Sequence, residues 1–93
     1  MAERRNRLEI IYDILKSIQD KRNMMIKPTH LLYKSNLSHD GMKRYIDELK
    51  AGNMIAETED PKTKNKMFTL TEKGCKFLEE FNKVKAFTDS FGI

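Results

Sequence analysis

The side chains in this sequence that could do chemistry are cations at short, regular spacings. Lys43 and Arg44 are adjacent in one segment, and Lys62, Lys64 and Lys66 occupy alternate positions in another. Ammonium and guanidinium groups bind phosphate oxygens and can also read the acceptor edge of guanine. The pattern indicates contact with a polyanion, against the alternative of an ordinary solvated charged surface.

The positive charge is concentrated in the middle of the chain. The formal net charge is +4, from 18 Lys and Arg against 14 Asp and Glu. Residues 1–20 and 67–93 are each balanced, with four bases and four acids, so the whole excess lies in residues 21–66, which hold ten bases and six acids. A localised basic surface is typical of proteins that bind nucleic acid, although a soluble domain can also be basic by chance.

The chain lacks the motifs of an enzyme, a metal site or a cofactor site. It has no Gly-rich phosphate loop and no nucleophile elbow. His30, His39 and Cys75 do not have metal-ligand spacing, and the one cysteine is expected to be a buried, inert thiol rather than a redox switch. We therefore expect no catalytic activity, no metal and no cofactor, and no small-molecule ligand is evident.

Length and hydropathy place further bounds on the chain. Its 93 residues fit a single domain over 1–93. No apolar run approaches the roughly 18 residues that a membrane span needs, and no signal peptide is visible behind the basic N-terminus. The expectation is a cytoplasmic, nucleoid-associated protein.

Periodic apolar residues predict the helices of the first half. Residues 3–20 read as a helix, because apolar side chains recur every three or four positions from Leu8 to Ile18. Ile26 fits a very short strand, and Pro28 starts a short helix over residues 29–35. Ser38 is expected to cap a third helix over residues 39–51. The buried stripe of that helix is Met42, Tyr45, Ile46 and Leu49.

The second half predicts a hairpin followed by a longer helix. Residues 54–58 and 67–70 are strand-like, and the polar segment 59–66 connects them. Thr71 caps a last helix that ends near residue 90. Tyr12, Tyr33 and Tyr45 each stand beside an apolar stripe, so core or half-buried positions are expected for them rather than stacking on bases.

Together these elements predict a mainly α fold with a small β-hairpin. A short helix, a tight turn and a capped amphipathic helix form a helix-turn-helix, and the hairpin after it forms a wing. The predicted fold is a winged helix-turn-helix in the order helix-helix-helix-strand-strand-helix.

Several blocks of the sequence resemble archaeal winged helix-turn-helix DNA-binding proteins. The resemblance covers about residues 5–85, and within that group the chain is similar to the family of ten-kilodalton archaeal chromatin-type proteins. It implies DNA binding by a homodimer whose last helices pair as an antiparallel coiled coil. The blocks are Pro28-Thr29 to Leu37-Ser38, Tyr45-Ile46-x-x-Leu49-x-x-Gly52-x-Met54-Ile55 and Phe68-x-Leu70-Thr71-Glu72-Lys73-Gly74-x-x-Phe77-Leu78.

The predicted dimer interface lies on the last helix, residues 71–90. This helix spans barely two heptads, which departs from the family, and a coiled coil of that length is marginal on its own. The first helix, residues 3–20, is therefore an alternative part of the interface. The predicted dimerisation residues are Phe77, Phe81, Val84, Phe87 and Phe91.

The expected DNA-binding residues come from three segments. In a helix-turn-helix the second helix, here residues 38–51, lies in the major groove. The wing, residues 59–66, offers lysines to phosphates, and the N-terminus of the helix 29–35 is a further phosphate site. The predicted set is Lys27, Thr29, Lys34, Ser38, His39, Lys43, Arg44, Asp47, Lys62, Lys64 and Lys66.

Other roles stay open at this point. Asp40 and Asp47 can read a cytosine amino group or pair with Lys43 and Arg44. The three N-terminal arginines, Arg4, Arg5 and Arg7, form either a basic arm or a frayed terminus.

The sequence favours double-stranded DNA binding, as a transcription regulator or an architectural chromatin protein. One alternative is a winged helix that serves as a protein–protein adaptor in a transcription assembly, because several acids are expected on the surface. A second alternative is RNA binding.

Overall fold

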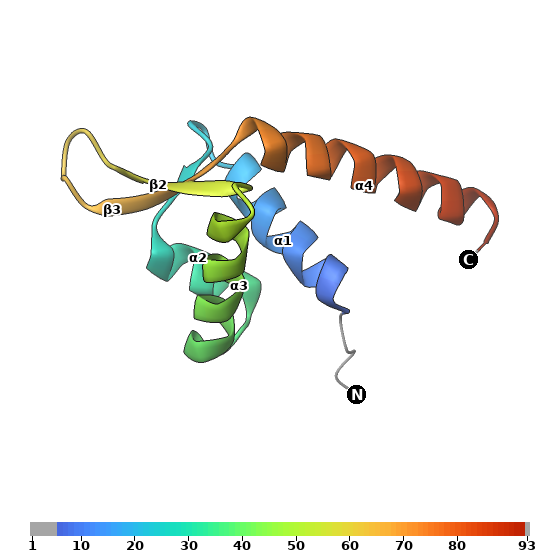
Figure 1. The fold of residues 1–93 in the computed structure, drawn as a ribbon, viewed down its shortest axis with the longest axis horizontal. Helices are drawn as coiled ribbons and strands as arrows, with labels where there is room; N and C mark the ends of the chain where they lie inside the picture. Colours follow the sequence, from blue (N-terminus) through green and yellow to red (C-terminus); the bar gives the residue numbers. More distant parts are fainter. Residues whose placement is uncertain (1–5, 93) are drawn as a thin grey trace.

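The computed structural model describes residues 6–92 and forms a winged helix-turn-helix (Figure 1). This confirms the predicted fold class, and the very short strand expected at Ile26 joins the hairpin as a third strand. The elements in chain order are α1 (Arg7–Gln19), β1 (Met25–Ile26), α2 (Pro28–Ser35), α3 (His39–Ala51), β2 (Ile55–Glu59), β3 (Lys66–Leu70) and α4 (Glu72–Ser90).

Helix α1 is the centre of the core. Its N-terminus is closed by a capping box, in which the Asn6 side chain accepts from the Glu9 amide and the Glu9 carboxylate accepts from the Asn6 amide. Because apolar side chains recur at helical spacing, one face of α1 is fully buried against the other elements. The buried residues are Ile11, Ile14, Leu15 and Ile18. The first three residues of the predicted helix, 3–5, lie outside the described residues.

The turn between α2 and α3 sets the helix-turn-helix geometry. Asn36 ends α2 in the left-handed region, at φ 58° and ψ 32°, a conformation that asparagine tolerates better than most residues. Ser38 then caps α3 as predicted, because its hydroxyl oxygen accepts the Gly41 N–H at 3.1 Å. The predicted apolar stripe of α3 packs on the core, with Met42, Ile46 and Leu49 buried and Tyr45 half-buried.

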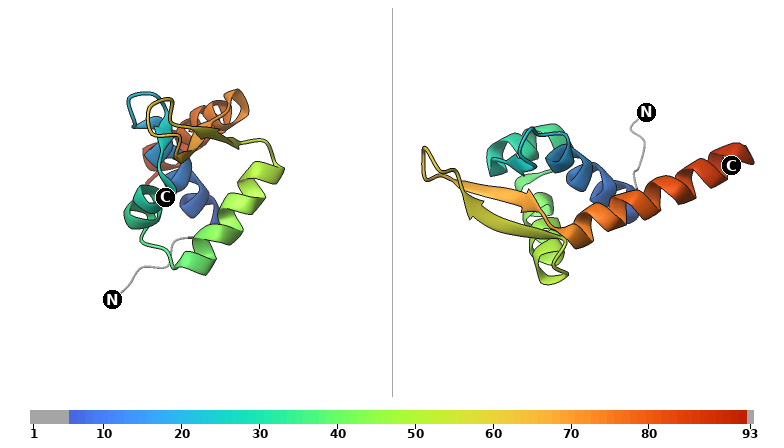
Figure 2. Two further views of the ribbon diagram at one scale, coloured as in Figure 1. Left: turned by 90° about the vertical axis from the view of Figure 1, so that its left-hand side faces the viewer. Right: turned by 90° about the horizontal axis from the view of Figure 1, so that it is seen from above.

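The three strands form one antiparallel sheet in the order β1-β3-β2. Ile26 pairs with Phe68, and the β2–β3 hairpin runs from the pair Ile55 and Leu70 out to the pair Glu59 and Lys66. The inner side of β3 joins the helical core, while the hairpin extends beyond it as the wing (Figure 2).

Helix α4 starts against the core and then leaves it. At its start Gly74 is buried, and a Cβ there would overlap the Met54 carbonyl oxygen and lie 2.8 Å from Leu70 Cδ1, so only glycine fits without a shift of its neighbours. Leu78 is the last fully buried residue of the helix. The rest of α4 projects away from the wing (Figure 1), and the molecule measures 47 × 31 × 23 Å.

The three tyrosines differ in how far they are buried. Tyr12 and Tyr45 are half-buried, as expected. The same expectation is wrong for Tyr33, which is 85% exposed. Helix α2 is short and buries Leu31 and Ser35, which share one face, whereas Tyr33 lies about 200° around the helix from Leu31.

Candidate nucleic-acid interface

The outer face of α3 presents the polar side chains that the sequence assigns to it. His39, Lys43, Arg44 and Asp47 are all exposed, on the side of the helix that does not pack on the core. The Lys43 ammonium lies 3.4 Å from Asp47 Oδ2, one turn along the helix. Asp47 is therefore engaged by a neighbouring lysine, which is one of the two roles that the sequence left open for it.

A groove of about 320 Å³ separates α3 from α2 and the wing. Its apolar floor includes Leu32, Ile46 and Phe68. Several of the predicted DNA-binding residues line it, although they come from three separate elements. These residues are Thr29 from α2, His39, Lys43 and Asp47 from α3, and Lys66 from β3.

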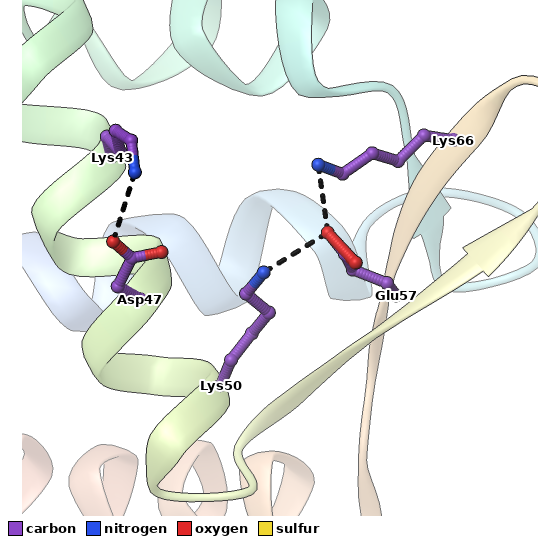
Figure 3. Close-up of polar contacts among 5 residues, drawn as sticks. All are labelled: Lys43, Asp47, Lys50, Glu57 and Lys66. Carbon is purple, nitrogen blue, oxygen red and sulfur yellow. Dashed lines mark hydrogen bonds and ion pairs between the residues drawn. The ribbon is translucent and has the colours of Figure 1, made fainter.

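A second cluster of ions joins α3 to the wing across this groove (Figure 3). Glu57 Oε1 on β2 lies 3.1 Å from the Lys50 ammonium and 2.9 Å from the Lys66 ammonium. Hydrogen bonds first from Lys66 and then from Lys50 lower the pKa of Glu57 below its ordinary value. The Lys66 ammonium also lies 5.6 Å from the centre of the Phe68 ring, within the range of a cation–π contact.

Sequence reasoning did not assign Lys50 or Glu57 to the site. Neither residue belongs to the predicted DNA-binding set, and for Glu57 the sequence predicts only a place in the strand 54–58. The available signal was the strand alternation, which puts Glu57 and Glu59 on the same side of β2 as the buried Ile55. That signal does not say which helix this side of β2 faces.

The wing tip is a closed turn rather than an extended loop. The Asp60 carboxylate accepts the backbone N–H groups of Lys62 at 2.8 Å and Thr63 at 3.4 Å, and the Lys64 N–H donates to the Asp60 carbonyl at 2.8 Å. Lys64 has a φ of 63°, and Lys66 already belongs to β3. Lys62 and Lys64 therefore lie on the tip, whereas Lys66 points back to Glu57.

Asp60 is held in its ionised form by this turn. The backbone N–H of Lys62 is the main cause that lowers the Asp60 pKa below its ordinary value, and the N–H of Thr63 adds to it. The sequence carried the signal, because Asp followed by Pro favours a turn closed by the Asp side chain. The Asp60 carboxylate thus shapes the wing tip.

The remaining predicted residues lie around the rim of the interface. Lys27 is the residue before α2, and Lys34 is in its last turn; both side chains are exposed. The pKa of His30 is lowered below its ordinary value, first by burial and then by the charges of Lys21, Lys34 and Lys27. These lysines thus form a second concentration of positive charge beside α2.

The N-terminal arginines do not form a free arm where they are described. Arg7 is within α1, and its Nη1 donates to Glu48 Oε2 on α3 at 3.0 Å. This pair fixes the start of α1 against the outer side of α3. Arg4 and Arg5 lie outside the described residues.

Within residues 6–92 no three His, Cys, Asp or Glu side chains are grouped so as to hold a metal ion. None of the helices in that range combines the length and the hydropathy needed to cross a bilayer. Cys75 is a free thiol and is half-buried rather than fully buried as expected.

Solved structures of known proteins share this fold. Sso10a-2, a DNA-binding protein from Sulfolobus solfataricus, superposes with a TM-score of 0.71 at 23% identity, over 95% of this chain and 90% of that one. BpsR from Bordetella bronchiseptica, whose DNA binding is regulated by 6-hydroxynicotinic acid, gives 0.69 at 22% identity, over 87% of this chain and 61% of that one. Sco3205, a MarR family transcriptional regulator from Streptomyces coelicolor solved in complex with DNA, gives 0.66 at 17% identity, over 75% and 44% of the two chains.

Sequence comparison gives a relative and a family. An uncharacterised protein of Methanocaldococcus jannaschii is 31% identical over 81 residues, which are 87% of this chain and 34% of that protein, so the chain spans about a third of the relative's length. The family model described as winged helix-turn-helix matches residues 4–89. The resemblance to archaeal winged helix-turn-helix proteins is thereby confirmed, and the chain belongs to the winged helix-turn-helix family.

Proposed function

We propose that the chain binds double-stranded DNA, as a transcription regulator or an architectural chromatin protein of the nucleoid. The observation that carries this proposal is the groove between α2, α3 and the wing, which gathers cations from separate elements around the exposed side of α3. The DNA-binding proteins among the structures that share the fold support it. In this proposal residues 1–93 act as one winged helix-turn-helix domain.

In the proposed complex α3 enters the major groove with its N-terminal half. Arg44 points away from the core and is free to make a bidentate contact with guanine O6 and N7 or to bind a phosphate. Lys43 can exchange its contact with Asp47 for a phosphate, because an exposed ion pair of this kind is weak. His39 and Ser38 stand at the first turn of α3, within reach of the edge of the groove.

The wing and α2 contribute contacts to the DNA backbone. Lys62 and Lys64 on the wing tip carry charges that bind phosphates without reading sequence. At the start of α2, Thr29 lines the groove and Lys27 precedes the first turn, whose N–H groups favour an anion. Lys34 extends this basic rim toward the far end of α2.

We further propose that two copies of the chain associate through α4. Phe77 and Phe81 are half-buried, and Phe81 stacks on Tyr12 with ring centres 4.7 Å apart. Beyond them the same side of the helix carries apolar side chains that no described residue covers. Their exposed fractions are 62% for Val84, 64% for Phe87 and 67% for Phe91.

The occupant of this surface is a second copy of the chain. A notch of about 420 Å³ lies between α1 and α4 beside Tyr12, Phe81 and Val84, and it continues the exposed apolar side of α4. Antiparallel packing of two such helices would place the exposed end of each α4 into the notch of the partner. Apolar side chains recurring every three or four residues along a projecting helix favour such a pairing.

Sedimentation velocity tests the dimer. The wild-type chain is expected to sediment as a dimer at micromolar concentration, and the double variant Phe87→Glu/Phe91→Glu as a monomer with unchanged helix content by circular dichroism. Ala86→Glu is the matched control, because Ala86 lies on the opposite side of α4. A monomeric wild type, or equal effects of the two variants, would contradict the dimer.

A salt titration of duplex binding tests the DNA proposal. Each phosphate contact contributes a slope of about −0.9 to log K against log salt, so a protein that binds through several lysines loses affinity steeply. Competition with duplex RNA in the same assay separates DNA binding from RNA binding. No affinity for duplex DNA at low salt would instead favour an adaptor that binds protein.

The adaptor is kept as a second candidate because of one observation. Asp47 and Glu57 neutralise lysines on the groove, which gives this face alternating charges rather than a uniform positive field. Such a face also suits an oppositely patterned protein surface.

A further inference from the structure

The feature that carries this inference is the carboxylate of Glu57, which is shared by two lysines from different elements. A single oxygen, Oε1, lies 3.1 Å from the Lys50 ammonium on α3 and 2.9 Å from the Lys66 ammonium on β3. Figure 3 shows the carboxylate between the two ammonium groups, on the side of β2 that faces α3. Both lysines also line the groove that separates α3 from α2 and the wing.

A carboxylate and a phosphate compete for the same donors. Both are oxygen anions that accept charge-assisted hydrogen bonds from ammonium groups. The side chains of Lys50, Glu57 and Lys66 all keep a third or more of their surface in contact with solvent, and exposed ion pairs are held weakly. An incoming phosphate therefore meets lysines that can be released but are already partly neutralised.

We propose that Glu57 occupies, in the free protein, the position on Lys50 and Lys66 that a DNA phosphate would take, and thereby limits the affinity for duplex DNA irrespective of sequence. This inference rests on the proposed DNA-binding function and adds to it a residue that sets binding strength without contacting DNA. Glu57 divides the basic residues into two groups. Lys50 and Lys66 are held by it, whereas Arg44, Lys62 and Lys64 form no ion pair within residues 6–92.

The division has consequences for the salt dependence of binding. A lysine that stays paired with an internal carboxylate when DNA binds neutralises less phosphate charge than a free lysine does. It therefore contributes less than one full phosphate contact to the slope of log K against log salt. Removal of the Glu57 charge frees both lysines. The slope should steepen by about 0.9 for each lysine that gains a phosphate, and the affinity at 0.1 M salt should rise by about 8-fold for each one.

The test compares Glu57→Gln with Glu59→Gln. Both variants remove one negative charge from the exposed side of β2, but Glu59 forms no ion pair among the described residues. Binding to a fluorescent 20-base-pair duplex of arbitrary sequence is measured by anisotropy between 0.05 and 0.2 M salt. We expect Glu57→Gln to bind about 8-fold tighter or more at 0.1 M salt with a steeper slope, and Glu59→Gln to change the affinity much less. Thermal unfolding of each variant verifies that the fold is retained.

A double-mutant cycle adds a readout that a structural role would not change. Lys66→Gln should cost little affinity in the wild type but several-fold more in the Glu57→Gln background, because only there is the lysine available to a phosphate. Equal costs of Lys66→Gln in the two backgrounds would overturn the inference. Weaker duplex binding by Glu57→Gln than by the wild type would also overturn the inference. Glu57 would then position the two lysines for DNA rather than compete with a phosphate for them.

The outcomes separate this inference from the proposed function. If the wild type binds duplex DNA with a steep salt dependence and Glu57→Gln does not differ from Glu59→Gln, only the role of Glu57 is wrong. If neither the wild type nor Glu57→Gln binds duplex DNA at 0.05 M salt, the proposed function is wrong and the role of Glu57 with it.

Discussion

The lysines of the wing tip allow the most quantitative prediction. The tip is closed by Asp60, which leaves Lys62 and Lys64 exposed, and neither lysine forms an ion pair within the described part of the chain. Lys66, two residues further on, is instead held by Glu57. The perturbation is the double variant Lys62→Gln/Lys64→Gln, which removes both charges and keeps polar side chains and the backbone donors of the turn.

The expected magnitude follows from counting phosphate contacts. If each of the two lysines binds one phosphate, the slope of log K against log salt should flatten by about 1.8. With the affinity extrapolated to 1 M salt unchanged, the loss should be about 60-fold at 0.1 M and about 20-fold at 0.2 M. Because lysine contacts to phosphate carry no base information, the loss should be alike for all duplex sequences.

Anisotropy titrations with two unrelated duplexes measure both quantities. Lys76→Gln/Lys83→Gln is the matched control, since it removes the same charge from exposed positions on α4, which points away from the wing (Figure 2). A loss confined to one duplex would refute the reasoning, because the wing would then read bases. An equal loss in the control would mean that net charge, and not the wing, governs binding.

Three further predictions concern α3, α4 and the wing turn. Lys43→Ala/Arg44→Ala should weaken duplex binding by at least about 8-fold at 0.1 M salt without a change in the circular dichroism spectrum, and unchanged affinity would remove α3 from the interface. Gly74→Ala should lower the free energy of unfolding by about 1–3 kcal/mol, because the added methyl group overpacks the core. Each kcal/mol corresponds to a fall in Tm of roughly 4–8 °C for a domain of this size. An unchanged Tm would show that Met54 and Leu70 can move aside. Because the Asp60 pKa is lowered in the folded protein, the wing turn's contribution to stability should be complete above the ordinary carboxyl pKa of 3.8 and be lost as the pH falls through the lowered value. The Lys62 amide resonance, followed by NMR, should therefore hold its position until the pH is below 3.8. A titration midpoint of this resonance above 3.8 would contradict the role of Asp60 in the turn.

The helices and their ends could be predicted from the sequence because their causes are local. Ser38 and Thr71 cap α3 and α4 as expected, since each hydroxyl accepts an amide only three residues ahead. Gly52 follows the last residue of α3, and the apolar stripe of that helix is the face that packs on the core. Strand β1 was anticipated only around Ile26, because two residues of strand carry little periodicity.

The interface was only partly predictable because its contacts depend on how distant elements meet. The sequence places Lys66 on the wing, but the contacts of Lys50 and Lys66 with Glu57 depend on how the β2–β3 hairpin lies beside α3. The half-buried position expected for Tyr33 is wrong because α2 is short and buries only one narrow face. The residues that set charge balance at the groove are thus those that tertiary packing, and not local pattern, brings together.

Mapping of the contact surface by NMR tests the central claim most directly. A 15N-labelled sample is titrated with an unlabelled 20-base-pair duplex at low salt, and the amide shifts are followed along the chain. The account predicts the largest changes in the first turn of α2, along α3 and at the wing tip, residues 60–65, with few changes on the projecting half of α4. Changes concentrated on α1 and α4, with α3 and the wing tip unaffected, would contradict it.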